Sequence, residues 1–339
     1  MSTAVAALNL PFRTNVDLID LGTKDPRLAG ILSPDYDEKV VRNYIHQQFL
    51  DDAGEYMNKY TSHDHWRRIL TTAQSHLRLP LHEQLNILDL GSGGGNTIFP
   101  LLDLYPYATV IASDLSVPLL RALKRKQLQD YPERQCLVMQ LNAEELVFAD
   151  GQFDLVVGAA ILHHLFDPQK SLREAARVLK PGGCALFFEP FETGQQIVAL
   201  AMVNLMGISD FHRSRGSHET LPDAAVEAFK RICIDFAVRK GSDKSGEIYR
   251  NIDDKWLFTR SYLQAAATRC GFREVELYPL YGVERLFSSQ VATYLRLSAG
   301  LELSALPGWA QQYLQGLDQH FSPDARQDLL LEAGVVLRK

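Results

Sequence analysis

The feature that most constrains the fold is an apolar run that ends in a cluster of glycines, N-I-L-D-L-G-S-G-G-G-N-T at residues 86–97. Ile87, Leu88 and Leu90 are typical of a buried strand, and a helical pattern begins near Asn96. Because glycine lacks a Cβ, the backbone can turn tightly there and its N–H groups can come close to a ligand. The stretch therefore predicts a ligand-binding turn between a strand and a helix, with an ordinary turn as the alternative.

A second apolar run ends in an acidic residue about twenty positions later. The sequence T-V-I-A-S-D-L-S at residues 109–116 predicts a neighbouring strand with Asp114 at its tip. A carboxylate at this place in a βαβ unit can accept hydrogen bonds from ribose hydroxyls. The two runs together predict binding of a nucleoside-containing cofactor.

Strand and helix patterns alternate through residues 85–190, which predicts an α/β fold with a doubly wound, mostly parallel sheet. The expected strands cover residues 87–90, 110–112, 137–140, 153–157 and 184–188, and two more cover 273–280 and 332–339. Before the fifth strand, Asp167 is the expected N-cap of a helix, Pro168 lies in its first turn, and the Pro-Gly-Gly at residues 181–183 ends it. These elements predict a single large core sheet.

Five segments organise the chain around this sheet. They are an N-terminal arm (1–34), a helical lid (35–84), the cofactor-binding core (85–190), an inserted helical cap (191–256), and a C-terminal part of the core with its own helical insertion (257–339). An insertion after the fifth strand lies at the carboxyl ends of the strands, where ligands bind in such sheets. We therefore expect the cap to cover the substrate.

The spacing of the glycines separates this chain from dinucleotide-binding proteins, because the third glycine comes one residue early for the G-x-G-x-x-G pattern. The motifs L-D-L-G-S-G-G-G, S-D-L-S, N-A-E-E and R-V-L-K-P-G-G follow in order. In sequence and spacing they resemble class I S-adenosylmethionine-dependent methyltransferases of the small-molecule type. The resemblance covers residues 85–190 well and 257–285 with the final strand loosely, and it implies a Rossmann-like, seven-stranded sheet.

The resemblance also implies which residues contact S-adenosylmethionine. The glycines would line its methionine part, Asp89 would support the ammonium group, Asp114 would hold the ribose, and Asn142 would face the adenine amino group. Asn142 stands where many relatives have aspartate, and its amide oxygen can still accept from an amine, although it could serve only as a turn residue. The expected cofactor contacts are Asp89, Gly91, Ser92, Gly93, Gly95, Asp114, Leu115, Asn142, Ala143 and Ala160.

Two further residues are candidates for catalysis. Transfer of a methyl group from a sulfonium requires positioning of the acceptor and removal of its proton. His163 follows the fourth strand and Glu189 ends the fifth, so parallel neighbouring strands would present both to one pocket. Glu189 could orient His163, bind the acceptor or act as the base, and His164 is a less favoured base. The alternative is that the His-His pair only packs the loop.

Aromatic and histidine residues gather in the predicted lid, among them Tyr36, Tyr44, Tyr56 and Tyr60. Most of these rings are expected to pack helix faces against the sheet, whereas one or two tyrosines could close over the cofactor. His63-Asp64-His65 lacks a partner cluster, and we interpret it as a helix N-terminus with Ser62 or Asp64 as the cap. The four cysteines are scattered as well, so no metal site is expected.

Charge and composition narrow the choice of acceptor. A net charge of −6 disfavours a nucleic-acid substrate, and the apolar run at residues 197–206 predicts a partly apolar acceptor pocket. No secretory signal or membrane span is evident, so a cytoplasmic protein is expected, with homo-oligomerisation possible. We therefore expect methylation of a small specialised metabolite. The rival functions are methylation of protein or RNA, and binding of S-adenosylmethionine without transfer.

Overall fold

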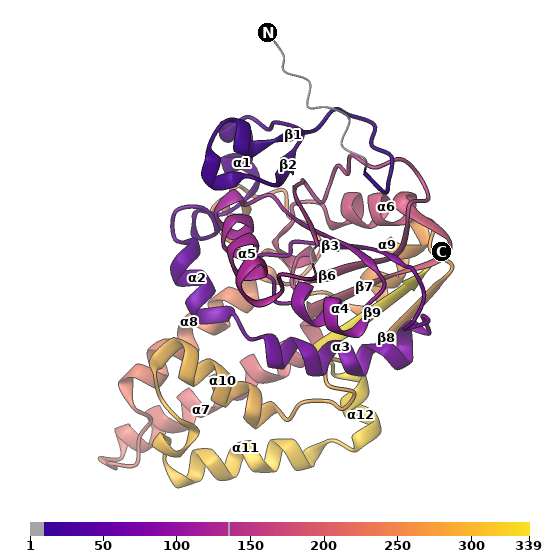
Figure 1. Ribbon diagram of the computed structural model, residues 1–339. Coiled ribbons are helices and arrows are strands. Elements are labelled where there is room, and N and C mark those ends of the chain that lie inside the picture. Colours follow the sequence, from indigo (N-terminus) through magenta and orange to yellow (C-terminus); the bar gives the residue numbers. More distant parts are fainter. Residues whose placement is uncertain (1–9, 135) are drawn as a thin grey trace.

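The computed structural model describes residues 10–134 and 136–339, in which nine strands form one sheet with the order β1-β2-β5-β4-β3-β6-β7-β9-β8 (Figure 1). The strands are β1 (Ile19–Asp20), β2 (Ile31–Ser33), β3 (Asn86–Leu90), β4 (Thr109–Asp114), β5 (Leu137–Gln140), β6 (Phe153–Ala159), β7 (Leu179–Pro190), β8 (Glu274–Pro279) and β9 (Glu332–Arg338). All seven strands expected from the sequence are present, which confirms the α/β, Rossmann-like fold class.

The topology reverses direction at β3. From β3 the chain crosses to β4 and then β5 on one side, and it returns to β6 and β7 on the other, with all five strands parallel. Leu90 at the end of β3 pairs with Ser113 of β4 and Gly158 of β6, so these three strands end level with one another. Such a switch point is where ligands bind in open α/β sheets.

The last two strands close the sheet in antiparallel fashion, with β9 between β7 and β8. At the opposite edge, β1 and β2 extend the sheet beyond seven strands, because β2 pairs in parallel with β5. The described part of the predicted N-terminal arm is thus partly built into the sheet, which its irregular sequence did not indicate. Residues 1–9 of that arm, including most of the region judged to lack a secretory signal, lie outside the described residues.

Helices cover both faces of the sheet and one end of it. They are α1 (Glu38–Tyr44), α2 (Ala53–Tyr60), α3 (His63–Leu77), α4 (Ile98–Leu104), α5 (Val117–Asp130), α6 (Pro168–Val178), α7 (Glu192–Ser214), α8 (Asp223–Arg239), α9 (Arg260–Arg269), α10 (Phe287–Ala299), α11 (Gly308–His320) and α12 (Pro323–Asp328). Short 3-10 helices are η1 (Leu21–Thr23), η2 (Pro26–Leu28), η3 (Gln47–Phe49), η4 (Leu162–His164), η5 (Glu247–Arg250) and η6 (Leu303–Ala305).

Local signals in the sequence explain where the core helices begin. Asp167 caps α6 by accepting the N–H of Gln169 at 3.1 Å, and Pro168 occupies the first turn, as expected. Ser116 caps α5 in the same way through the N–H of Leu119 at 3.2 Å. The predicted helix start at residues 62–64 is also confirmed, because Ser62 is the N-cap residue of α3.

Two apolar clusters fill the two faces of the sheet. Leu70 of α3 and Phe99 of α4 are buried in one cluster, together with side chains of α5. Leu172 of α6 and Ala266 of α9 are buried in the other. Since both faces of the parallel strands are covered, the central strands are apolar throughout, as in other doubly wound sheets.

A third apolar cluster belongs to α7, α8, α10 and α11, which gather at one end of the molecule (Figure 1). The two insertions that are separate in the sequence therefore form one helical body. The apolar run at residues 197–206 lies in α7, and Val198, Met202 and Leu205 are buried within this cluster. Along the described chain, no helix is long and apolar enough to cross a membrane.

Candidate functional site

The glycine loop after β3 adopts backbone conformations that other residues rarely reach. Gly91, Gly93 and Gly95 have φ angles of 66°, 49° and 97°. A Cβ on Gly91 would lie 2.6 Å from Ile161, and one on Gly95 would lie 2.4 Å from the ring of Phe99. A Cβ on Gly93 would meet no atom within 4 Å. Gly91 and Gly95 thus permit close packing within the protein, whereas Gly93 leaves free space at the pocket.

Asp114, at the end of β4, links the two neighbouring strand ends. Its Oδ2 accepts the N–H of Gly93 at 2.9 Å, and its Oδ1 accepts the N–H of Ser116 at 2.8 Å. Burial raises the pKa of Asp114, while these backbone N–H groups favour its charged form. Asp114, the residue expected to bind the ribose, is therefore held in a fixed orientation beside the glycine loop.

Asp89 and Ser92 lie behind the loop. Asp89 is fully buried, and its Oδ2 accepts a hydrogen bond from the Thr97 hydroxyl at 2.7 Å. Its Oδ1 has no hydrogen-bond partner among the described residues, and burial raises the pKa of Asp89 to about 7. Ser92 Oγ accepts the N–H of Ser113 at 2.9 Å, which ties the loop to β4. Ser92 therefore supports the loop from outside the pocket.

A pocket opens at the carboxyl ends of β3 to β6, where the switch point predicts it. Its lining residues come from the lid, from the strand ends and from the segment after α8: Tyr44, Ile45, His46, Phe49, Tyr56, Gly91, Gly93, Asp114, Leu115, Leu119, Leu141, Asn142, Ala143, Glu144, Ala159, Ala160, Ile161, His164, Leu165, Phe166, Asp253 and Lys255. Seven of the ten expected cofactor residues belong to this set. Asp89, Ser92 and Gly95 do not.

The loops after β5 and β6 contribute specific features to the lining. Asn142 Oδ1 accepts the N–H of Glu144 at 3.0 Å, so the side chain does stabilise a turn, with Ala143 inside it. Ala160, directly after β6, has a φ of 55°. A positive φ at a residue with a Cβ costs roughly 1–2 kcal/mol. Strained backbone of this kind is concentrated at functional sites.

Aromatic side chains of the lid form another part of the lining. Tyr44, Phe49 and Tyr56 line the pocket, and burial strongly raises the pKa of Tyr56, which keeps its hydroxyl protonated. Tyr36 contacts the rim, since its hydroxyl accepts the N–H of Asn142 at 3.2 Å. Gln48 of η3 donates to the Asp253 carboxylate, so the lid contacts the segment that follows the cap helices.

His163 and Glu189 do not line the pocket. The Glu189 side chain is 0% exposed, and its Oε1 accepts the N–H of Leu162 at 2.8 Å. His163 Nδ1 lies 2.6 Å from Glu189 Oε2, and Nε2 faces Asp254. Burial lowers the pKa of His163, but the charges of Glu189 and Asp254 outweigh it and raise that pKa to about 9. Both side chains thus lie outside the lining of this pocket, whereas the sequence placed them where the acceptor binds.

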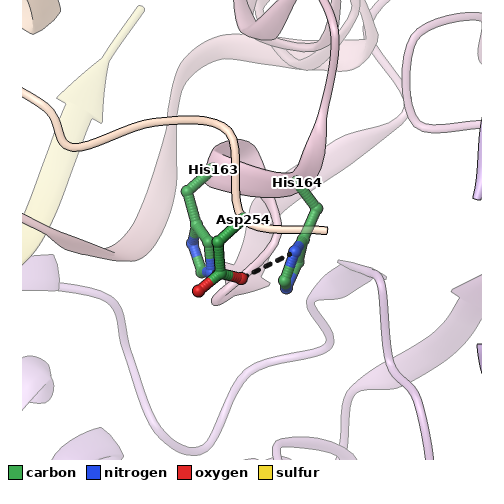
Figure 2. Close-up of side chains that lie close together, drawn as sticks. All are labelled: His163, His164 and Asp254. Atoms are coloured by element: carbon green, nitrogen blue, oxygen red, sulfur yellow. Dashed lines mark ion pairs between the residues drawn. The ribbon is translucent and has the colours of Figure 1, made fainter. Parts of the chain in front are cut away.

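His164, the less favoured base, is the histidine of the pair that borders the pocket. Its ring lies beside the carboxylate of Asp254 (Figure 2). Its Nδ1 lies 3.1 Å from Asp253 Oδ1 and 3.3 Å from Asp254 Oδ1. Its ring meets that of Phe49 edge to face, with centroids 5.3 Å apart. Part of the pocket lining therefore consists of polar, ionisable side chains.

Sequence reasoning missed the contribution of residues 253–255. The charged run D-D-K at residues 253–255 comes directly before the apolar W-L-F at residues 256–258. This order could have indicated a segment whose apolar residues are buried while the charged residues before them face a cavity. Trp256 Nε1 donates to the carbonyl of Leu165 at 2.8 Å, and this anchor aims Asp253 and Lys255 at the pocket. The apolar run at residues 197–206, predicted to make part of the acceptor pocket apolar, does not contribute to the lining of this pocket.

The comparisons with known proteins agree with this geometry. Residues 88–187 match the family model described as a methyltransferase domain. Over 138 residues, the chain is 35% identical to demethylmenaquinone methyltransferase of Lactiplantibacillus plantarum, covering 40% of this chain and 56% of the relative. It is 29% identical over 261 residues to malonyl-[acyl-carrier protein] O-methyltransferase of Geobacter sulfurreducens, covering 77% of this chain and 79% of that protein. The matched region thus spans little more than half of the first relative.

Solved structures of methyltransferases resemble the chain more distantly. Phosphoethanolamine N-methyltransferase 2 of Haemonchus contortus, in complex with S-adenosyl-L-methionine, has a TM-score of 0.47 at 17% identity, covering 85% of this chain and 56% of that one. A SAM-dependent methyltransferase of Aquifex aeolicus has a TM-score of 0.45 at 11% identity, covering 84% and 97%.

The class of protein follows from the strand order, the glycine loop and the family match taken together. The chain contains a class I S-adenosylmethionine-dependent methyltransferase domain. The cofactor of this domain is S-adenosylmethionine, as expected from the motifs.

Proposed function

We propose that the protein transfers a methyl group from S-adenosylmethionine to a small molecule bound between the lid and the segment 253–255. One observation carries this proposal: the lining of a single pocket includes both the glycine loop with Asp114 and a polar wall made of His164, Asp253 and Lys255. Bound S-adenosylmethionine supplies an electrophilic methyl group. The polar wall binds the acceptor and orients its attacking atom toward that methyl group.

The residues present fit this cofactor. The free space beside Gly93 allows a ligand to approach the backbone, and Asp114 offers an anionic group for hydroxyl donors. We propose that Asp89 supports the ammonium group from behind the loop, because its Oδ1 has no hydrogen-bond partner among the described residues. We propose that Leu115, Asn142, Ala143 and Ala160 surround the nucleoside, with Asn142 using a second lone pair of its amide oxygen for the adenine amino group.

The roles of the two expected catalytic residues change in this proposal. Glu189 accepts backbone N–H groups of η4 and the Nδ1–H of His163, so it fixes the loop that carries His164. On its other side, His163 directs Nε2 toward the carboxylate of Asp254, 3.5 Å away. Both are therefore positioning residues, and the side chains that meet the acceptor belong to the polar wall.

Enclosure of the pocket supports a small acceptor over a macromolecule. Gln48 of the lid contacts Asp253, and Phe49 packs against His164, so lid and cap segment meet across the opening. A protein or RNA substrate would need a groove left open at this point. Relatives named as quinone and malonyl-carrier-protein methyltransferases support small acceptor groups as well.

The proposal is tested in two stages. Calorimetry should detect binding of S-adenosylmethionine and its demethylated product, and Asp114→Ala should weaken both at least about tenfold, whereas Asp130→Ala on the exposed end of α5 should not. Labelled S-adenosylmethionine is then incubated with pools of small molecules, peptides and RNA. Label in the small-molecule pool is expected. Label only in peptides or RNA would favour the macromolecular rival, and cofactor binding without transfer to any pool would favour a binding module.

A further inference from the structure

Two histidines and two aspartates converge at the edge of the pocket from parts of the chain about ninety residues apart. His163 and His164 lie in η4, and Asp253 and Asp254 lie in the segment after the cap helices. Figure 2 shows His163, His164 and Asp254 side by side. One donor atom each from His163, His164 and Asp254 lies within 4.8 Å of the other two. We propose that these three residues, with Asp253, form a binding site for one divalent transition-metal ion.

The separations between the donor atoms suit a shared ion better than direct hydrogen bonds. His163 Nε2 lies 3.5 Å from Asp254 Oδ1, and His164 Nδ1 lies 3.3 Å from the same oxygen and 3.1 Å from Asp253 Oδ1. Charge-assisted hydrogen bonds are shorter, about 2.7–2.9 Å. Ligands about 2.0–2.2 Å from one ion are roughly 3.0–3.5 Å apart along an edge of its coordination shell. The three measured distances fall in that range.

Surrounding contacts orient the donor atoms as in metal sites. Glu189 lies 2.6 Å from His163 Nδ1, which fixes the ring and directs Nε2 toward Asp254. Histidines that bind metals commonly donate their second N–H to a carboxylate in this way. Arg239 Nη1 holds Asp254 Oδ2 at 3.0 Å, so Oδ1 is left to face both imidazoles. His163 Nε2 and Asp254 Oδ1 are thus both held toward the proposed ion.

The charges of the cluster are also unbalanced when both imidazoles are neutral. The fixed cations next to the cluster are Arg239 and Lys255, and Lys255 Nζ lies 3.1 Å from the carbonyl of Asp253. The carboxylates paired with these histidines or with Arg239 are Glu189, Asp235, Asp253 and Asp254. With neutral imidazoles this leaves two negative charges, which one divalent ion neutralises. Two imidazole protons would do the same, and the experiment distinguishes these two occupants.

The mixture of ligands indicates the class of metal. Imidazole nitrogen suits Zn²⁺, Co²⁺, Fe²⁺ and Ni²⁺, whereas Mg²⁺ and Ca²⁺ prefer sites made of oxygen alone. His164 and Asp253 line the pocket, so a remaining coordination position would face the acceptor. An ion there would bind an acceptor oxygen and make its proton easier to lose. This second role rests on the proposed function, whereas binding of the ion does not.

Cobalt is the probe, because Co²⁺ reports its ligands by visible absorption. The full chain is freed of metal with a chelator and titrated with Co²⁺, followed by absorption and calorimetry. One ion should bind per chain, and Mg²⁺ should not compete. His164→Gln and Asp254→Asn should each weaken binding at least about 100-fold. His76→Gln is the matched control, since His76 also pairs with a carboxylate, Glu276 at 2.6 Å, but has no second histidine in its ion pair.

Circular dichroism verifies that each variant is folded before titration. The proposal is overturned if folded wild-type protein binds Co²⁺ no more tightly than folded His164→Gln, which would leave protons as the occupants. It is also overturned if His76→Gln loses binding to the same degree. Binding of S-adenosylmethionine is measured on the same metal-free samples. A protein that binds the cofactor and no Co²⁺ refutes the metal site alone, and one that binds Co²⁺ and no cofactor refutes the proposed function alone.

Discussion

The carboxylate of Glu189 lies 2.6 Å from Nδ1 of His163 and also accepts the backbone N–H groups of η4. One buried side chain at the end of β7 therefore fixes the whole loop that follows β6. Parallel pairing of Gly158 with Phe187 and of Ala159 with Phe188 brings the two strand ends together and makes this contact possible. The relationship explains why an acidic residue can be buried there.

Glu189→Gln should destabilise the fold. An amide NH₂ would replace one carboxylate oxygen and face N–H donors, which leaves donors unpaired in a buried place. The free energy of unfolding, measured by urea denaturation, should fall by about 3 kcal/mol. Glu302→Gln, at an exposed position, is the control and should change it little. Equal stability of the two variants would contradict the positioning role.

Substitutions at two glycines of the loop should separate binding from folding. Gly93→Ala should cost about 1–2 kcal/mol of stability for its positive φ, while its methyl group enters the free space at the pocket and weakens S-adenosylmethionine binding at least about tenfold. Gly95→Ala should cost a further 1–3 kcal/mol, because its Cβ would meet Phe99 at 2.4 Å. Thermal melts and calorimetry measure the two effects. Gly93→Ala with full cofactor affinity would argue against the proposed cradle.

The contact between Gln48 and Asp253 should slow release of the cofactor product. Gln48→Ala removes a hydrogen bond between lid and cap segment, worth about 1 kcal/mol. Dissociation of S-adenosylhomocysteine, followed in a stopped-flow chase experiment, should become about fivefold faster. Gln47→Ala, at the exposed neighbouring position, should leave the rate unchanged. Equal rates in the two variants would show that the lid does not hold the ligand.

Glu284 should make stability depend on pH. Burial raises its pKa from 4.5 to about 7, and its Oε2 has no hydrogen-bond partner among the described residues. Between pH 4.5 and pH 7, Glu284 keeps its proton in the folded state and releases it in the unfolded state. The contribution of Glu284 to the free energy of unfolding therefore falls as the pH rises through this range.

Glu284→Gln keeps the side chain neutral and should remove this fall. Relative to wild type, the variant should gain about 1–2 kcal/mol between pH 5 and pH 8, after allowance for solvent screening. Urea denaturation at both pH values measures the gain, with Glu302→Gln again as the control. A difference between Glu284→Gln and wild type that stays the same at both pH values would refute the raised pKa.

Much of the core could be predicted because its signals are local. The apolar run at residues 87–90, the glycines after it and Asp114 after the next run each report the conformation of a few adjacent residues. Parallel strands of one sheet then place their ends together by geometry alone, which is why Gly93 and Asp114 meet as expected. By contrast, β1 and β2 are too short to show an alternation of apolar and polar residues. The pairing of β2 with β5 also joins residues that lie far apart in the chain.

The sequence by itself determined the class of fold, the cofactor and the glycine loop with Asp114 beside it. The tertiary structure decided which side chains face the second half of the pocket. His163 and His164 are adjacent in sequence, yet only His164 borders the pocket, because Glu189 holds the other ring inward. Asp253 joins His164 across 89 residues through the folding of an insertion. No local pattern encodes such a contact, since it depends on how whole helices pack and not on the conformation of neighbouring residues.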